Sequence, residues 1–118
     1  MAKSDARIIE QYPDIMRVAQ DSHCVIFEND KVRVMEMMLK PGAKIEMHAH
    51  PALMAYSFGD AENKWILPDG FTQSVTMRKG QVTWHEAFAH AVENTGKMLT
   101  HLLVVEFKKC YHNKFPRL

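Results

Sequence analysis

The chain has 118 residues, of which 47% are hydrophobic and 25% charged. This size suits one domain with a hydrophobic core of its own. The 15 Lys and Arg residues balance 14 Asp and Glu residues, for a net charge of +1. Neither a basic nucleic-acid-binding surface nor an acidic tail is indicated, so we expect a small molecule or a second copy of the chain as partner.

The two cysteines, Cys24 and Cys110, lie far apart and form no Cys-x-x-Cys pair. A disulfide framework and a structural zinc site are therefore not expected. A single bridge between them stays open, but buried free thiols are the favoured interpretation. No signal-peptide pattern is visible, and no apolar run approaches the roughly 18 residues of a membrane span. We expect a cytoplasmic protein without a membrane segment.

Residues 1–20 differ in pattern from the rest of the chain. Two short helical turns are predicted, over 5–11 and 14–20, with Pro13 between them. Their apolar side chains form a stripe, made of Ile8, Ile9, Ile15, Met16 and Val18. We interpret residues 1–20 as an arm that packs on the main body or on a neighbouring subunit, and a frayed terminus is the alternative.

From His23 onward, short apolar segments alternate with turns. Eight or nine strands are predicted, over residues 25–27, 31–40, 44–50, 53–58, 63–67, 71–77, 81–84, 89–93 and 98–108. No helical period separates them, so an all-β sandwich or barrel is predicted in place of a parallel α/β sheet. We assign residues 21–109 to this barrel and residues 110–118 to a C-terminal tail.

The third predicted strand carries His48 and His50. Residues i and i+2 of a strand face the same way, so the two imidazoles project side by side from one sheet face. Two neutral imidazoles so placed can share a metal ion. A hydrogen-bonded or solvated histidine pair is the alternative. A later strand returns a third candidate, His90.

Two segments resemble the two conserved motifs of the cupins. The first motif is matched by Gly42, five further residues and the His-x-His pair. Residues 80–96 resemble the second motif, with its glycine, its single histidine and its downstream asparagine. The resemblance covers residues 23–108 and is greatest to small single-domain cupins of bacteria.

This resemblance implies a fold and a site. The implied fold is all-β, a double-stranded β-helix or jelly-roll barrel, here with a short, partly helical N-terminal arm. The implied site lies inside the barrel, where His48, His50 and His90 match the histidines that hold a divalent metal. Fe(II) is the first expectation, with Mn, Ni, Zn and Cu as alternatives. Open barrels of this kind have edge strands, and a homodimer is one way to cover them.

The sequence departs from the cupin pattern where a Glu usually follows the second histidine by four or five residues. Met54 and Ala55 hold those positions. Three-histidine cupins without this carboxylate include thiol dioxygenases and a diketone-cleaving dioxygenase, while other cupins have lost the metal. The resemblance therefore implies a metal-dependent enzyme acting on a small organic molecule, with a dioxygenase first. Isomerase or lyase chemistry and a non-catalytic or metal-free ligand-binding protein are the alternatives.

Further side chains are candidates for the pocket. Tyr56 and Phe58 follow the histidine strand with matching parity, and with Met54 they are expected to line a substrate pocket, where Tyr56 offers its hydroxyl. Plain core aromatics are the alternative. The Met54 thioether is also a candidate copper ligand.

Two titratable residues are candidates for catalysis beside Tyr56. His101 is in phase with the apolar residues of the last strand and can face the pocket as a proton carrier. Glu86 stands where relatives often have Pro and can reach the metal through a water. A structural histidine and a solvated acid are the alternatives. The remaining histidines are expected to be surface groups, namely His23, His85 and His112.

Overall fold

Nine strands form two sheets in the computed structural model, which describes residues 8–108. The strands within this range are β1 (His23–Glu28), β2 (Val32–Leu39), β3 (Lys44–His50), β4 (Leu53–Ser57), β5 (Ala61–Ile66), β6 (Thr72–Met77), β7 (Val82–His85), β8 (Phe88–Asn94) and β9 (Thr100–Phe107). A short helix, α2 (Ile15–Val18), precedes them. The order and spacing of these strands agree with the pattern of apolar segments and turns in the sequence.

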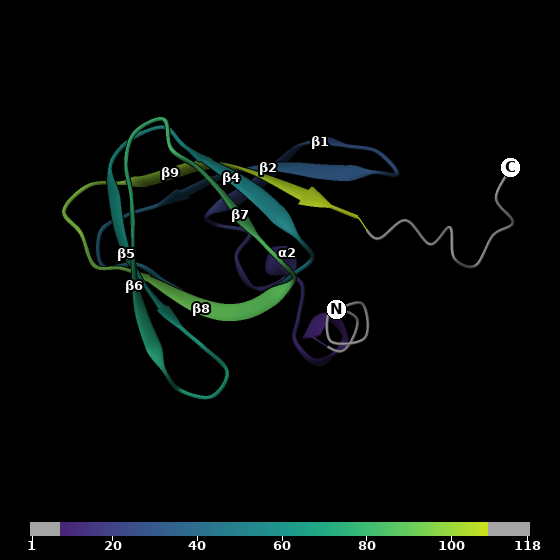
Figure 1. Ribbon diagram of the computed structural model, residues 1–118, viewed down its shortest axis with the longest axis horizontal. Coiled ribbons are helices and arrows are strands. Elements are labelled where there is room, and N and C mark those ends of the chain that lie inside the picture. Colours follow the sequence, from purple (N-terminus) through teal and green to yellow (C-terminus); the bar gives the residue numbers. More distant parts are fainter. Residues whose placement is uncertain (1–7, 109–118) are drawn as a thin grey trace, which may run out of the picture.

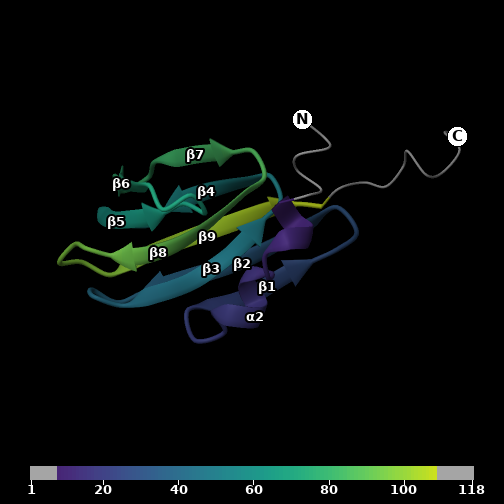
Figure 2. The same ribbon diagram turned by 90° about the horizontal axis from the view of Figure 1, so that it is seen from below.

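The two sheets face one another as layers. One sheet has the strand order β1-β2-β9-β4-β7 and the other has the order β3-β8-β5-β6. Every strand pair is antiparallel. In Figure 1 the strands β1, β2, β9 and β4 lie above and β8 lies below, and Figure 2 shows the same layers from below. The predicted all-β jelly-roll architecture is confirmed.

Alternation along the strands decides which side chains face inward. In β4 the buried residues are Leu53, Ala55 and Ser57, and the residues between them are exposed. In β2, Met35, Met37 and Leu39 are buried in the same alternating way. Strands that bury one face and expose the other show this period of two. The inward faces of both sheets enclose the core between the layers.

A β-bulge in β3 resets this alternation next to the histidines. Ile45 pairs with Val92 and His48 pairs with His90, so two residues of β3 lie opposite one residue of β8. The extra residue lets Ile45 and His48, three positions apart, both line the space between the sheets. Without the bulge, a period of two would place these side chains on opposite faces.

The N-terminal segment covers the free edge of β3. The Ala49 N–H donates to the Pro13 carbonyl at 2.8 Å, and Asp14 and Ala49 form a parallel bridge. Asp14 also caps α2 by accepting a hydrogen bond from the Met16 N–H. Ile15 is fully buried in the core. Figure 2 shows α2 beside β1 and β3. Within the described range, the arm packs on the main body.

The structure also bears on the cysteines and on membrane insertion. Cys24 is exposed, so its expected burial was wrong, because it lies on the outward-facing side of β1. Cys110 and the predicted tail, residues 110–118, lie outside the described residues. No helix between residues 8 and 108 is long and apolar enough to cross a membrane. The cytoplasmic location stays a prediction.

The buried contact of the N-terminal segment leads to a stability prediction. Ile15→Ala removes a fully buried side chain and leaves a cavity in the core, so we expect a loss of about 2–5 kcal/mol in the free energy of unfolding. Ile9→Ala is the control, because Ile9 is 37% exposed and its loss should stay within about 0.5 kcal/mol. Urea denaturation measures both, and equal small losses would show that the segment does not contribute to the core.

Candidate metal centre

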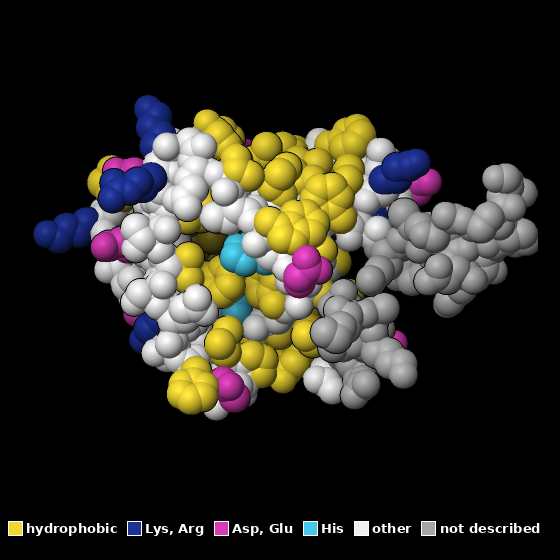
Figure 3. Space-filling model, viewed as in Figure 1, with side chains coloured by type: hydrophobic (Ala, Val, Ile, Leu, Met, Phe, Trp, Pro, Cys, Tyr) yellow, Lys and Arg dark blue, Asp and Glu magenta, His cyan; other side chains and the backbone are white. Residues whose placement is uncertain are grey.

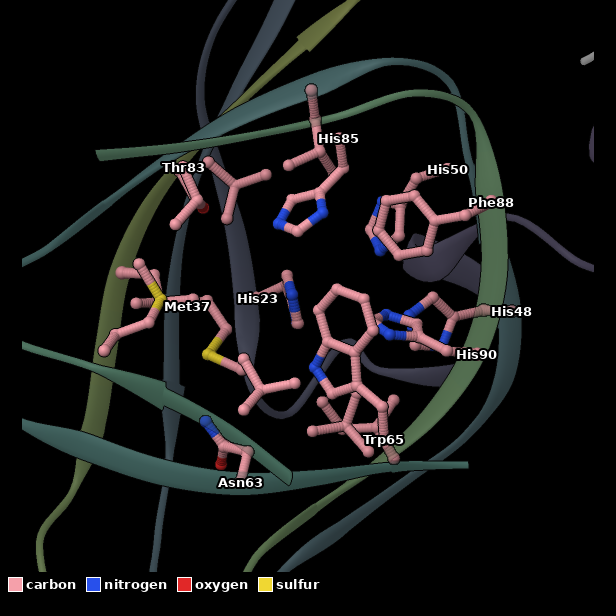
Figure 4. A pocket seen from close by; sticks show the side chains of 18 of the residues that line it. His23, Met37, His48, His50, Asn63, Trp65, Thr83, His85, Phe88 and His90 are labelled. Atoms are coloured by element: carbon pink, nitrogen blue, oxygen red, sulfur yellow. The ribbon is translucent and has the colours of Figure 1, made fainter. Parts of the chain in front are cut away.

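Three buried histidines converge between the sheets. His48 and His50 project from β3, and His90 projects from β8 directly opposite His48. The candidate ligand atoms of these three residues lie within 4.8 Å of one another. The three side chains are 1%, 4% and 5% exposed, and Figure 4 shows their rings gathered at one side of the pocket. The structure thus brings together the histidines that the motifs singled out.

Hydrogen bonds orient two of the three rings. His48 Nδ1 lies 2.7 Å from the Glu46 carbonyl oxygen, which can only accept, so this nitrogen carries the proton. His50 Nδ1 lies 2.5 Å from Oε2 of Glu106 and donates to that carboxylate. In both rings Nε2 keeps a free lone pair. An outer partner on one ring nitrogen is the usual way in which a ligating histidine is oriented.

The third ring provides the test of whether a metal ion fits. His90 Nδ1 is buried and has no hydrogen-bond partner among the described residues. Aromatic rings flank it edge-on, with centroids 4.2 Å away in Trp65 and 4.6 Å away in Phe88. A buried polar atom without a partner is costly, and a cation bound through this nitrogen would satisfy it. Three imidazoles suit zinc, iron, copper and nickel, so the residues fit a divalent metal ion.

The rings are held in the neutral form that ligation requires. Burial, together with the nearby His50, lowers the pKa of His48 to about 3. Burial and the neighbouring histidines also lower the pKa of His90 well below its usual value. A metal ion arriving at pH 7 would therefore displace no proton from these two rings.

The histidines open onto a cavity of about 100 Å³. Its walls are mainly apolar, and Figure 3 shows histidine side chains at the bottom of an opening bordered by hydrophobic ones. Of the described residues, no Lys, Arg, Asp or Glu lines it. Ala55 does line it, so a Glu at this position would project towards the cavity. The alanine leaves this part of the cavity wall without a carboxylate.

Two residues of this cavity were missed by the sequence reasoning. His23 and His85 were expected on the surface, but both line the cavity. His23 is 7% exposed, and burial lowers its pKa to about 4. Burial lowers the pKa of His85 as well. β1 begins at His23, two residues before the predicted strand. Residues two apart in a strand face the same way, so the inward-facing Val25 could have indicated that His23 also faces inward. His112 lies outside the described residues.

The expectation that residues in and just after β4 line the pocket was wrong. Met54, Tyr56 and Phe58 are 37%, 38% and 41% exposed and do not line the cavity. The inward phase of β4 falls instead on Leu53 and Ala55. The chain turns between β3 and β4. Even-numbered residues of β4 therefore do not face inward as His50 does.

The two other catalytic candidates also lie outside the cavity. His101 places Nε2 2.6 Å from Oε2 of Glu36, and its ring lies against Phe58 on the outer face. The inward phase of β9 falls on its even-numbered residues, including Glu106. Glu86 is exposed and accepts a hydrogen bond from Trp84 Nε1 at 2.8 Å. The geometry therefore removes His101, Glu86 and Tyr56 from the candidate catalytic groups.

Solved structures of low sequence identity share this arrangement of strands. A cupin domain from Bordetella pertussis Tohama I has a TM-score of 0.67 and 19% identity, over 83% of this chain and 97% of that chain. The fold is that of the cupins. An RmlC-like cupin from Methanocaldococcus jannaschii has a TM-score of 0.59 and 13% identity, over 72% of this chain and 77% of that chain.

A third cupin-fold structure carries a functional description. It is a predicted oxalate decarboxylase from Thermotoga maritima, with a TM-score of 0.53 and 21% identity, over 72% of this chain and 77% of that chain. No protein-family model and no curated protein sequence matches the chain. At these identities the comparisons establish the cupin fold and leave the activity to be argued from the site.

The lowered histidine pKa values lead to a prediction for the metal-free protein. His23 and His48 stay neutral in the folded state at pH 5, with pKa values of about 4 and 3, whereas in the unfolded chain they take up protons near pH 6.5. Their contribution to stability is therefore complete above pH 6.5 and is lost as the pH falls towards 3–4. We expect each of these two histidines to lower the free energy of unfolding by about 2 kcal/mol between pH 7 and pH 5.

Urea denaturation in the presence of a chelator, at pH 7 and at pH 5, measures this loss. His23→Gln should remove its own share of the pH dependence, because glutamine does not titrate. The same pH dependence in that variant and in the wild type would contradict a neutral, buried His23.

Proposed function

We propose that the chain is a metal-dependent cupin that binds a small organic molecule in the cavity between its sheets. His48, His50 and His90 would hold one divalent ion, with Fe(II) as the first candidate and Mn, Ni, Zn and Cu as alternatives. The observation that carries the proposal is the convergence of three buried imidazoles within 4.8 Å. The unpartnered Nδ1 of His90 supports it, because ligation through that nitrogen would account for the atom.

A divalent ion in this site would supply Lewis acidity, or a centre for activating dioxygen if it is iron. Three protein ligands leave coordination positions for a substrate atom. The resemblance to three-histidine cupins favours a dioxygenase as the reaction class, with isomerase or lyase chemistry as the competitor. Ala55 supports this choice, because it stands on the cavity wall where a carboxylate ligand is otherwise expected.

The side chains of the cavity would select and orient the substrate. Trp65 and Phe88 stack with their ring planes 6° apart and form an apolar wall that excludes water. The Thr83 hydroxyl is buried without a partner among the described residues and can bond a substrate oxygen. His23 and His85, neutral at pH 7, each present a ring nitrogen that can accept or return a proton.

A second candidate function is a cupin that binds a small ligand without metal. The absent carboxylate favours it, because Met54 and Ala55 offer no acid at the usual position. In that case the neutral histidines would act as hydrogen-bonding groups towards the ligand. The two functions differ in one measurable property, which is the metal dependence of the three histidines.

Metal content separates these functions. Protein purified without chelator and without a nickel column should contain close to one equivalent of metal, or take it up from Fe(II), Mn(II), Ni(II), Cu(II) or Zn(II). His48→Ala, His50→Ala and His90→Ala should each weaken binding by more than the roughly 10–100-fold typical of an outer-shell change. Elemental analysis and thermal unfolding with each ion measure this.

The control is His101→Ala, because His101 bonds Glu36 on the outer face and lies outside the cavity. Its metal content should equal that of the wild type. If the wild type takes up none of the five ions, metal-dependent chemistry is excluded and the metal-free binding protein becomes the function to pursue.

A further inference from the structure

Glu106 is an almost fully buried carboxylate that stands directly behind a candidate ligand. It is 2% exposed, and both of its oxygens are in use. Oε2 accepts from His50 Nδ1 at 2.5 Å, and Oε1 accepts from Arg33 Nε at 2.9 Å. Arg33 in turn donates from Nη1 and Nη2 to the two oxygens of Asp14, at 3.0 and 2.8 Å. These contacts link the N-terminal segment to His50.

The charges of this chain of contacts matter for a metal ion. A dication held by three neutral imidazoles carries its full positive charge into a cavity whose described lining contains no acid. Burying such a charge without a counter-charge is costly. Asp14, Arg33 and Glu106 together carry one net negative charge. That charge lies one hydrogen bond behind the ligand ring.

The N-terminal segment makes two contacts near the histidines, one with β3 and one with the Arg33 side chain of β2. Its backbone pairs with Ala49, the residue between the two ligands of β3. Its Asp14 side chain forms an ion pair with the Arg33 guanidinium, which also pairs with Glu106. Arg33 presents its donors in a rigid fork, so the position of Asp14 constrains the position of Glu106.

We propose that Glu106 supplies, from behind His50, the negative charge that a carboxylate ligand would otherwise bring to this site, and that Asp14 and Arg33 are the residues that position it. The inference rests on the proposed metal-binding function. It assigns the N-terminal segment, whose backbone covers the β3 edge, a second role in tuning metal affinity.

Two substitutions test the proposal. Glu106→Gln keeps the size of the side chain and one oxygen that can accept from His50, but it removes the charge and turns its NH2 group towards Arg33. We expect Zn²⁺ affinity to fall about 10–100-fold. Asp14→Asn lies at the far end of the contacts, and we expect a smaller fall of about 3- to 10-fold. Competition with a chelator measures both affinities, and the visible spectrum of the Co²⁺-loaded protein reports changes around the ion.

Each substitution has a matched control. Glu36→Gln removes a carboxylate that also contacts a histidine, at 2.6 Å, but on the outer face. Glu28→Gln removes an exposed partner of a lysine, Lys108, at 2.7 Å. Both should bind Zn²⁺ as the wild type does. Thermal unfolding of the metal-free variants shows whether each one folds. If Glu106→Gln does not fold, the Zn²⁺ affinity of Asp14→Asn tests the proposal.

The outcomes are distinct. Wild-type affinity in both Glu106→Gln and Asp14→Asn would overturn the inference and leave the proposed function intact. Loss in Glu106→Gln alone would overturn the role of the N-terminal segment. A wild-type protein that binds no Zn²⁺ and no Co²⁺ would overturn this inference together with the proposed metal site.

Discussion

The pairing of β3 with β8 is the constraint on which the site depends. It sets His48 directly opposite His90 and, through the bulge after Ile45, turns the histidines of β3 inward. Cross-strand neighbours approach to about 5 Å, which is close enough for two imidazoles to serve one ion. Loss of that register by one residue would move the histidines of β3 to the outer face. The sheet edge beside them is held by the N-terminal segment, so the register and the arm support each other.

The candidate site combines neutral imidazoles with an apolar surrounding. Burial keeps the rings of His48 and His90 unprotonated, and the same burial makes an added positive charge costly. In the proposed site the compensating charge lies outside the three histidines, in the contacts from His50 to Glu106 and onward to Arg33. Ala55 leaves the cavity wall without a carboxylate, while Glu106 lies behind His50. A site without a direct carboxylate can thus still have an anionic neighbour.

The sequence predicted the strands and the three histidines because both have strong local signals. Alternating apolar residues and turn residues mark strands, and the two motifs mark the histidines that the structure brings together. Errors arose where parity had to be carried across a turn, as with Tyr56, or guessed within a nearly continuous apolar run, as with His101. In such a run either phase can face inward, and only the partner strands decide. His23 and Glu106 were missed because their surroundings come from strands distant in the sequence.

Trp65 places a fluorescent indole in the wall of the cavity. Its indole stacks on Phe88 and meets the ring of His90 edge-on, with centroids 4.2 Å apart. The other tryptophan, Trp84, lies on the outer face against Phe107. Indole emission depends on its immediate surroundings and is quenched by nearby paramagnetic ions. The two indoles therefore form an internal pair of fluorophores, one beside the histidines and one remote from them, and their emission distinguishes events inside the cavity from events on the surface.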